Sequence, residues 1–327
     1  MKKSRITFLI AEISLAILAA IFVSKIFLSE KPQKRIAVIV ENSGDEKWNS
    51  FINGLKQAAS MNNIHLIICN TDEIENADEE RALVYEQLEN DVDGFIIQAA
   101  PGYEVLEIME ELVTQKPVVM VKNDVLVSEA DKLIRSHIEL PTVMTDNYNI
   151  GYRLGEELLK DNAGDIQGMT VGIVSGLAET DSAVKRQQGL LDALEGSGCD
   201  IIWMLNRTYD RGAVTMVEAQ EQADIIAVLD SETLEQFGDA AGEEKKIKSK
   251  LYGIGSSMKC VYYLDEGRLC SLIIEDDYGM GYDSVTELAH RLEHGMYTIP
   301  NITTDFRVLQ KDDIFEEETQ QFLYTYD

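Results

Sequence analysis

Trp48 is the residue whose type and position best suggest a function, because it stands where a predicted strand gives way to a predicted helix. The apolar run Ile36–Val40 has the composition of a strand, and a polar loop around Gly44 follows it. Phe51 and Leu55 continue from Trp48 at helical spacing. Since open α/β sheets bind ligands beyond the carboxyl ends of their strands, we predict that Trp48 forms one wall of a binding cleft. The alternative is an indole that only packs inside the protein.

Other residues with catalytic or metal-binding chemistry form no recognisable pattern. The sequence contains no Gly-x-Ser-x-Gly elbow, P-loop or HExxH motif, and nothing in it marks a nucleophile or a general base. His290 and His294 are four residues apart on a predicted helix but have no third metal ligand nearby, which favours an ordinary helix face. We therefore predict a protein that is not an enzyme and that holds no metal and no cofactor.

The four cysteines indicate neither a zinc site nor a redox compartment. They are Cys69, Cys199, Cys260 and Cys270, without CxxC spacing. Two interpretations are open. Cys260 and Cys270 are close enough in sequence to form a disulfide in an oxidising compartment, or all four are small apolar residues of the interior, which we favour.

Composition and charge narrow the class of protein. With 327 residues, 45% of them hydrophobic and 27% charged, the chain is a globular protein long enough for two domains. The 58 acids outnumber the 29 bases, which gives a formal net charge of −29. Such a charge repels phosphate backbones and suits a solvated surface, so we predict no binding to nucleic acid.

Residues 1–33 differ from the rest of the chain and predict a membrane segment with a linker. A helix from Thr7 to Leu28 would reach about 33 Å, which is enough to span a bilayer. Glu12 and Lys25 lie near the ends of this span, where charged side chains cost least.

The basic residues before the span predict its orientation. Lys2, Lys3 and Arg5 indicate a cytoplasmic N-terminus, so about nine tenths of the chain would lie outside the cytoplasm. The apolar run continues past the small residues 16–20, which favours an uncleaved single-pass anchor in the cell membrane over a cleaved signal peptide and secretion. No cysteine precedes Cys69, which excludes a lipid-attachment cysteine at the end of the segment.

Strands and helices alternate after the linker. The predicted strands are Ile36–Val40, His65–Cys69, Gly94–Gln98, Val118–Val121, Thr170–Val174, Ile201–Met204, Ile225–Leu229, Lys250–Ile254 and Leu269–Glu275. The predicted helices are Trp48–Met61, Glu79–Asn90, Glu104–Thr114, Asn149–Asp161, Ala183–Gly196 and Ala213–Gln222. Alternation of this kind, with continuous apolar strands, predicts an α/β fold with parallel sheets. The pattern occurs twice with a break near Pro141–Asp146, which predicts two Rossmann-like lobes and a cleft between them.

Several segments together resemble the type 1 periplasmic binding proteins of the ribose-binding kind. They are Ile36–Val40 with Trp48 and Gly54, Asp93–Gln98, Lys116–Val121, Asp146 and Asn147 with Gly151, Ser182–Gly189, and Tyr278–Tyr282. The resemblance covers about residues 34–327 and implies a receptor that closes by a hinge on a small polar ligand, typically a sugar. It also implies an N-terminal lobe of residues 34–143 plus about 276–303, and a C-terminal lobe of 144–275 plus about 304–327.

The resemblance assigns ligand-binding residues by position. Trp48 matches an aromatic residue that stacks on the ligand, and Tyr209 matches an aromatic residue of the second lobe. Asp45 stands where the family often has an amide. Arg186 matches an arginine that hydrogen-bonds ligand oxygens.

The remaining candidates depart from the family pattern. Lys122 and Asn123 replace a common acid–arginine pair, and Asp124 is the nearest substitute for that acid. Glu232 replaces a common asparagine, and Glu275 takes a glutamine-like position at the hinge. These departures leave a sugar, an amino-bearing molecule or another polar ligand open.

The predicted function is that of an extracytoplasmic solute-binding protein. Its hinge is expected near Asp146, Glu275 and Thr303–Phe306. Its partner would be either an ABC permease or a membrane sensor kinase, and an uncleaved anchor favours the sensor. The alternatives are a secreted enzyme on an α/β fold and a degenerate receptor that acts only through protein contacts.

Overall fold

The computed structural model describes residues 13–15, 17–18, 33–162, 166–207, 212–242 and 247–324. The chain divides into two compact units, Met1–Lys34 and Arg35–Asp327. In the first unit residues 13–15 and 17–18 are helical and exposed, residues 33–34 lead into the first strand, and most of the predicted span Thr7–Leu28 lies outside the described residues. Among the residues that the structure does describe, no helix is both long and apolar enough to cross a membrane.

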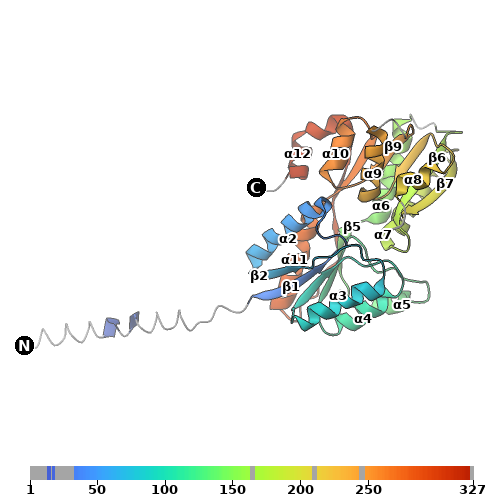
Figure 1. The fold of residues 1–327 in the computed structure, drawn as a ribbon. Helices are drawn as coiled ribbons and strands as arrows, with labels where there is room; N and C mark the ends of the chain where they lie inside the picture. Colours follow the sequence, from blue (N-terminus) through green and yellow to red (C-terminus); the bar gives the residue numbers. More distant parts are fainter. Residues whose placement is uncertain are drawn as a thin grey trace, which may run out of the picture. The chain divides into compact units, whose positions relative to one another are not determined.

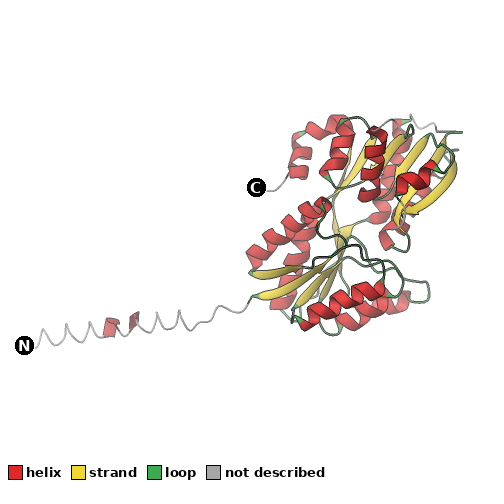
Figure 2. Cartoon of the chain, viewed as in Figure 1, coloured by secondary structure: helices red, strands yellow, loops and turns green. Residues whose placement is uncertain are grey.

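The second unit contains two sheets of six strands each (Figures 1 and 2). The first has the order β11-β5-β4-β3-β1-β2 and the second the order β12-β10-β9-β8-β6-β7. The strands of the first sheet are β1 (Lys34–Ile39), β2 (Ile64–Ile68), β3 (Gly94–Ile97), β4 (Val118–Val121), β5 (Thr142–Thr145) and β11 (Ile302–Thr304). Those of the second are β6 (Thr170–Leu177), β7 (Asp200–Arg207), β8 (Ile225–Val228), β9 (Lys250–Ile254), β10 (Ser271–Glu275) and β12 (Phe306–Leu309). β12 is antiparallel to β10, while β6, β7, β8, β9 and β10 run parallel to their neighbours in that group.

Helices cover both sheets and define two lobes. The first lobe has η1 (Glu46–Trp48), α2 (Asn49–Asn62), α3 (Ala77–Glu89), α4 (Val105–Val113), α5 (Lys132–His137) and α11 (Asp277–Glu293). The second has α6 (Asn147–Asp161), α7 (Asp181–Leu194), α8 (Ala213–Glu218), α9 (Ser231–Gly242), α10 (Met258–Asp265), η2 (Lys311–Phe315) and α12 (Glu317–Tyr324). The expected α/β fold of two lobes with parallel sheets is confirmed.

Burial on both faces explains why the strands read as continuous apolar runs. In β8, Ile225 and Ala227 pack into the cluster with α6 and α7, whereas Ile226 and Val228 pack into the cluster with α9 and α10. Both faces of this strand are therefore shielded from solvent, as is usual for a parallel sheet covered by helices on each side.

All nine predicted strands are present within a few residues of their expected limits, and β5, β11 and β12 are additional. β11 has only three residues, which is too short for periodicity to reveal it. β5 has four residues like β3, but threonines stand at both of its ends, so it does not read as a continuous apolar run. The chain passes from one lobe to the other three times, at Asp146, Asp276 and Asp305. Asp146 and Asp276 accept hydrogen bonds from Asn149 N (3.0 Å) and Gly279 N (2.8 Å), so each caps the helix that begins after its crossing.

A glycine contact brings α6 and α7 together. A Cβ atom at Gly151 would lie 2.0 Å from Arg186 O, and one at Gly189 would lie 2.0 Å from Tyr148 O. Neither backbone can admit a methyl group, so the two helices approach at the distance that only glycine permits. This contact fixes the position of Arg186, which belongs to the site described below.

We expect Gly151→Ala to lower the free energy of unfolding by about 1–3 kcal/mol, because it overpacks this contact. In an exposed helix the same change would stabilise the protein by up to about 1 kcal/mol. The sign of the stability change therefore distinguishes a close helix contact from an exposed position. Urea denaturation measures the difference. Gly295→Ala is the control, because a Cβ there meets no atom within 4 Å. A stabilised Gly151→Ala variant would contradict the close packing of α6 on α7.

Candidate functional site

Loops from both lobes meet around a cavity of about 120 Å³. Its walls come from segments that follow the carboxyl ends of strands in each sheet, which is where open α/β sheets bind ligands. The first lobe contributes Glu41, Lys47, Trp48, Gln98, Lys122 and Asn123, and the second contributes Ser182, Arg186, Arg207, Asp230, Glu232 and Ser256, among others. Glu275 and Asp277 lie at the crossing between lobes and complete the lining.

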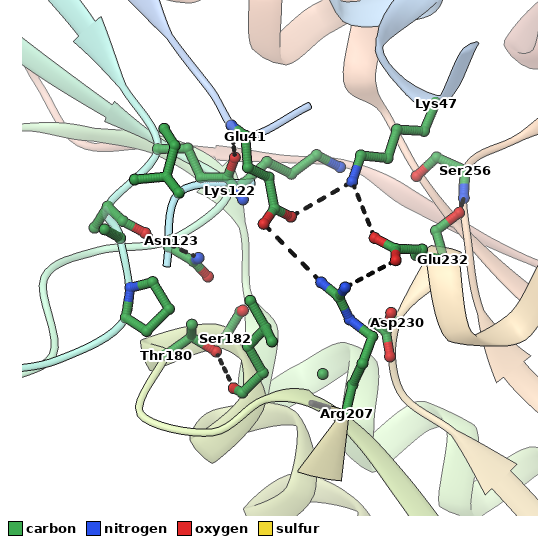
Figure 3. Close-up of a pocket in the computed structure, with 18 of the residues that line it drawn as sticks. Glu41, Lys47, Lys122, Asn123, Thr180, Ser182, Arg207, Asp230, Glu232 and Ser256 are labelled. Carbon is green, nitrogen blue, oxygen red and sulfur yellow. Dashed lines mark hydrogen bonds and ion pairs between the residues drawn. The ribbon is translucent and has the colours of Figure 1, made fainter. Parts of the chain in front are cut away.

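Four charged side chains form a ring across the cavity, which we call the charge ring: Glu41 and Lys47 of the first lobe, Arg207 and Glu232 of the second (Figure 3). Lys47 Nζ lies 3.4 Å from Glu41 Oε1 and 3.6 Å from Glu232 Oε2. Arg207 lies 2.8 Å from Glu232 Oε1 and 4.0 Å from Glu41 Oε2. Two acids and two bases balance in charge, so the ring joins the lobes without an excess of either sign.

Burial raises the pKa of the Glu232 carboxyl group, and the neighbouring cations Arg207 and Lys47 oppose that shift. Arg207 is itself only 7% exposed, so this pair is largely removed from water. Breaking one side of such a pair leaves a poorly solvated charge behind.

A second group of charges, the hinge cluster, consists of Lys122, Arg186, Glu275 and Asp277. Lys122 Nζ lies 3.2 Å from Glu275 Oε2 and also donates to Asp277, while Arg186 Nη2 lies 3.1 Å from Glu275 Oε2. Burial alone would raise the pKa of Glu275, but Arg186 and Lys122 outweigh it and lower that pKa to about 2. The cluster is therefore a neutral set of two cations and two anions at the point where the chain changes lobes.

Arg186 uses all three of its guanidinium nitrogens. Nε donates to Asn147 Oδ1 at 2.7 Å, Nη1 to Leu229 O at 3.1 Å and Nη2 to Glu275. Asn147 in turn donates to Lys122 O at 3.2 Å, which links this group to the first lobe. Arg186 thus holds several segments of the hinge in place as well as lining the cavity.

Some acceptors in the cavity wall are not satisfied by the described part of the chain. Asn123 Oδ1, Asp230 Oδ2 and Glu232 Oε2 are buried atoms without a hydrogen-bond partner among the described residues. Buried polar atoms in native proteins nearly always have partners, so these acceptors indicate where donors of a ligand would be bound.

Comparison with known proteins identifies the family. A family model described as "Periplasmic binding protein domain" matches residues 36–295. The chain belongs to this family. Searching curated proteins by sequence gave no match.

Solved structures agree with the fold of a periplasmic binding protein. A carbohydrate transporter solute-binding protein from Agrobacterium radiobacter, solved with D-arabinose, is 16% identical, with a TM-score of 0.77 over 90% of this chain and 100% of that one. GanP, a glucose-galactose binding protein from Geobacillus stearothermophilus, is 20% identical, with a TM-score of 0.74 over 88% and 100%. The XylFII-LytSN complex contains a chain that is 15% identical, with a TM-score of 0.71 over 86% and 99%. The predicted resemblance is confirmed, and the family is one of binding proteins, as expected for a chain that is not an enzyme.

In this periplasmic binding protein domain, six of the predicted site residues line the cavity: Trp48, Lys122, Asn123, Arg186, Glu232 and Glu275. Trp48 is only 3% exposed. Its indole N–H donates to Glu41 O at 2.8 Å and its ring packs edge-on against Phe51 at 5.4 Å. Most of the indole therefore packs within the first lobe, and its stacking on a ligand stays a prediction.

Of the other three predicted residues, two do not line the cavity and one is not described. Asp45 lines a neighbouring hollow instead of this cavity. Asp124 binds Arg135, with oxygens 2.9 Å and 3.0 Å from its Nη2. Tyr209 lies outside the described residues.

Sequence reasoning missed Glu41, Lys47, Arg207 and Asp230. Glu41 and Asp230 directly follow strands that the sequence did predict, so the rule on strand ends applies to them and was a usable signal. Arg207 ends β7, which the sequence predicted to stop three residues earlier, at Met204. The pairing of these charges across the cavity has no signal in a single sequence.

The cysteines and histidines form no site in the described residues. Cys69, Cys199, Cys260 and Cys270 are all free thiols, so Cys260 and Cys270 are not joined in this structure. Among the described residues there is no group of three or more side chains arranged to hold a metal ion.

Proposed function

We propose that this chain is an extracytoplasmic solute-binding protein that closes on a small polar ligand, a sugar in the first instance. The observation that carries the proposal is the cavity between the lobes. Its walls follow the carboxyl ends of strands in both sheets, and the charge ring spans it. A ligand held by both walls favours the closed state over the open one in proportion to its contacts with the two lobes.

The three crossings supply the hinge. They lie at Asp146, Asp276 and Asp305, and Asp276 N donates to Asp305 O at 3.0 Å. We therefore propose lobe boundaries at these crossings. The limits expected from the sequence, 34–143 plus about 276–303 and 144–275 plus about 304–327, then shift by one or two residues, because β5 runs to Thr145 and β11 to Thr304.

The sugar is suggested by two proteins of similar fold, one solved with D-arabinose and the other a glucose-galactose binding protein. The cavity agrees with this class, because charged and amide side chains bind hydroxyl groups well. We further propose a single-pass membrane anchor at residues 1–33, with the N-terminus in the cytoplasm and the binding domain outside. Its partner is then an ABC permease or a membrane sensor kinase, and the solved XylFII-LytSN complex supports keeping the second possibility.

A thermal-shift screen of the purified full-length chain against sugars, polyols, amino sugars and nucleosides tests the proposal. A true ligand at 100 times its dissociation constant stabilises by about 2.7 kcal/mol, which raises Tm by roughly 5–10 °C. Ser182→Leu should abolish the shift, because it places a bulky side chain in the cavity wall. Ser60→Leu, exposed on α2, is the control and should respond as the original chain does. If no compound raises Tm, the receptor function is wrong.

A further inference from the structure

The charges of the cavity do not cancel completely. Its ionisable lining consists of five acids and four bases: Glu41, Asp230, Glu232, Glu275 and Asp277 against Lys47, Lys122, Arg186 and Arg207. The charge ring pairs two acids with two bases, and the hinge cluster does the same. Among the described lining residues Asp230 alone is left over, which leaves one uncompensated negative charge in this part of the lining.

The two carboxyl oxygens of Asp230 have different surroundings, and Oδ1 holds the side chain in position. Oδ1 accepts from Thr233 N at 3.0 Å and so caps the first turn of α9. Oδ2 is a buried atom without a hydrogen-bond partner in the described chain. Figure 3 labels Asp230 on the cavity wall, on the same side as Glu232. No ion pair joins Asp230 to either side chain in the described residues, and its charge raises the pKa of the Glu232 carboxyl group.

Asn123 and Glu232 also present buried acceptors to the wall that have no hydrogen-bond partner among the described residues. Asn123 is only 6% exposed, and its Nδ2 donates to Ala99 O at 3.4 Å, which leaves Oδ1 as the free acceptor. Glu232 Oε2 has an ion pair with Lys47 at 3.6 Å but no hydrogen bond among the described residues. A ligand that completes this wall must bring donors.

We propose that the ligand is a polar molecule carrying a protonated amine, of the amino-sugar class, and that Asp230 binds its ammonium group. The proposal rests on the proposed receptor function and names its ligand class. A carboxylate oxygen buried without a partner, as Asp230 Oδ2 is, is costly, and a neutral hydroxyl group would satisfy its hydrogen bond but not its charge. An ammonium group supplies three donors and one positive charge, which matches both the acceptors and the charge imbalance of the cavity.

The test compares ring-matched probes. D-glucosamine, D-galactosamine and D-mannosamine are each measured beside the parent hexose and the N-acetyl derivative, which share the ring but carry no positive charge. Thermal shift and calorimetry use the full chain at pH 6.5, where an amine of this kind is protonated. At least one amino sugar should bind ten times more tightly than both of its neutral counterparts.

Asp230→Asn tests the assigned contact, because it keeps Oδ1 for the helix cap and removes the charge. Affinity for the amino sugar should fall at least tenfold, whereas affinity for the parent hexose should change less than threefold. Asp200→Asn, exposed on the same lobe, is the control for net charge and should change neither affinity.

Each other outcome overturns a defined part of the proposal. Neutral hexoses that bind as tightly as the amines overturn the ligand class but leave the receptor function standing. An amine preference that survives in Asp230→Asn overturns the assignment to Asp230. Absence of binding by every probe in this set overturns the amino-sugar class, and only failure of the wider screen also overturns the receptor function.

Discussion

Arg186→Ala is expected to lower the free energy of unfolding by about 3–5 kcal/mol, because it removes one partner from a buried ion pair. Glu275 would keep Lys122 but lose the guanidinium group, while Asn147 Oδ1 and Leu229 O would lose their donors. The guanidinium that matches a ligand-binding arginine is thus also a structural link of the hinge. Urea denaturation of the ligand-free chain at neutral pH measures the loss.

Two comparisons make this prediction specific. Arg153→Ala removes an arginine of α6 that is 40% exposed and pairs with the similarly exposed Glu156. Arg153 also lies 3.6 Å from the buried Glu157, which keeps Lys160 as its partner in the variant. Surface pairs of this kind contribute at most about 1 kcal/mol. The double variant Arg186→Ala with Glu275→Gln should be less unstable than the sum of the two single variants, because the second change removes the stranded charge. Equal losses for Arg186→Ala and Arg153→Ala would contradict the hinge cluster.

Glu80→Gln is expected to stabilise the protein at pH 8 by a few kcal/mol and to leave it nearly unchanged at pH 4. Glu80 is completely buried in α3, and this burial raises its pKa to about 8, although a hydrogen bond from Ala100 N at 2.6 Å acts in the opposite direction. Between the unfolded pKa near 4.5 and the folded pKa near 8, the folded state holds a proton that the unfolded state has lost. The stability of the original chain should therefore fall as the pH rises through this window.

Denaturation midpoints at pH 4, 6 and 8 measure this dependence. The glutamine amide keeps an acceptor for Ala100 N and cannot ionise, so this part of the pH dependence should disappear in the variant. Glu86→Gln on the exposed face of the same helix is the control and should leave the slope unchanged. A variant that loses stability at every pH would show that Glu80 acts as a carboxylate. Because Ala100 also lines the cavity, ligand affinity should become less dependent on pH in Glu80→Gln.

The two proposed roles of the cavity residues are separable in these experiments. The charge ring and hinge cluster join the lobes, so changes to them alter both stability and closure. Asp230 pairs with no cation in the described chain, so its charge is available to a ligand and its neutralisation should affect affinity above all.

The α/β alternation was predictable because it depends on local patterns. β1 and β3 are continuous apolar runs, and a helix of periodic polarity follows each after a loop. β11 was not predicted, because three residues do not establish a period and the strand forms by pairing beside β5. Helices α9 and α10 were also not predicted from the sequence. Their apolar side chains pack against the second sheet in the folded protein.

The sequence by itself determined the two lobes, the family and the edge of each sheet at which a site forms, because strand periodicity and chain order carry that information. It also placed Trp48, Lys122 and Arg186 at this edge. Only the tertiary structure decided which acids and bases of the cavity pair with one another. Pairs between the lobes join residues that are far apart in the chain, such as Glu41 and Arg207. Which acid remains without a cation follows from those distances, and for that reason Asp230 emerged only from the folded protein.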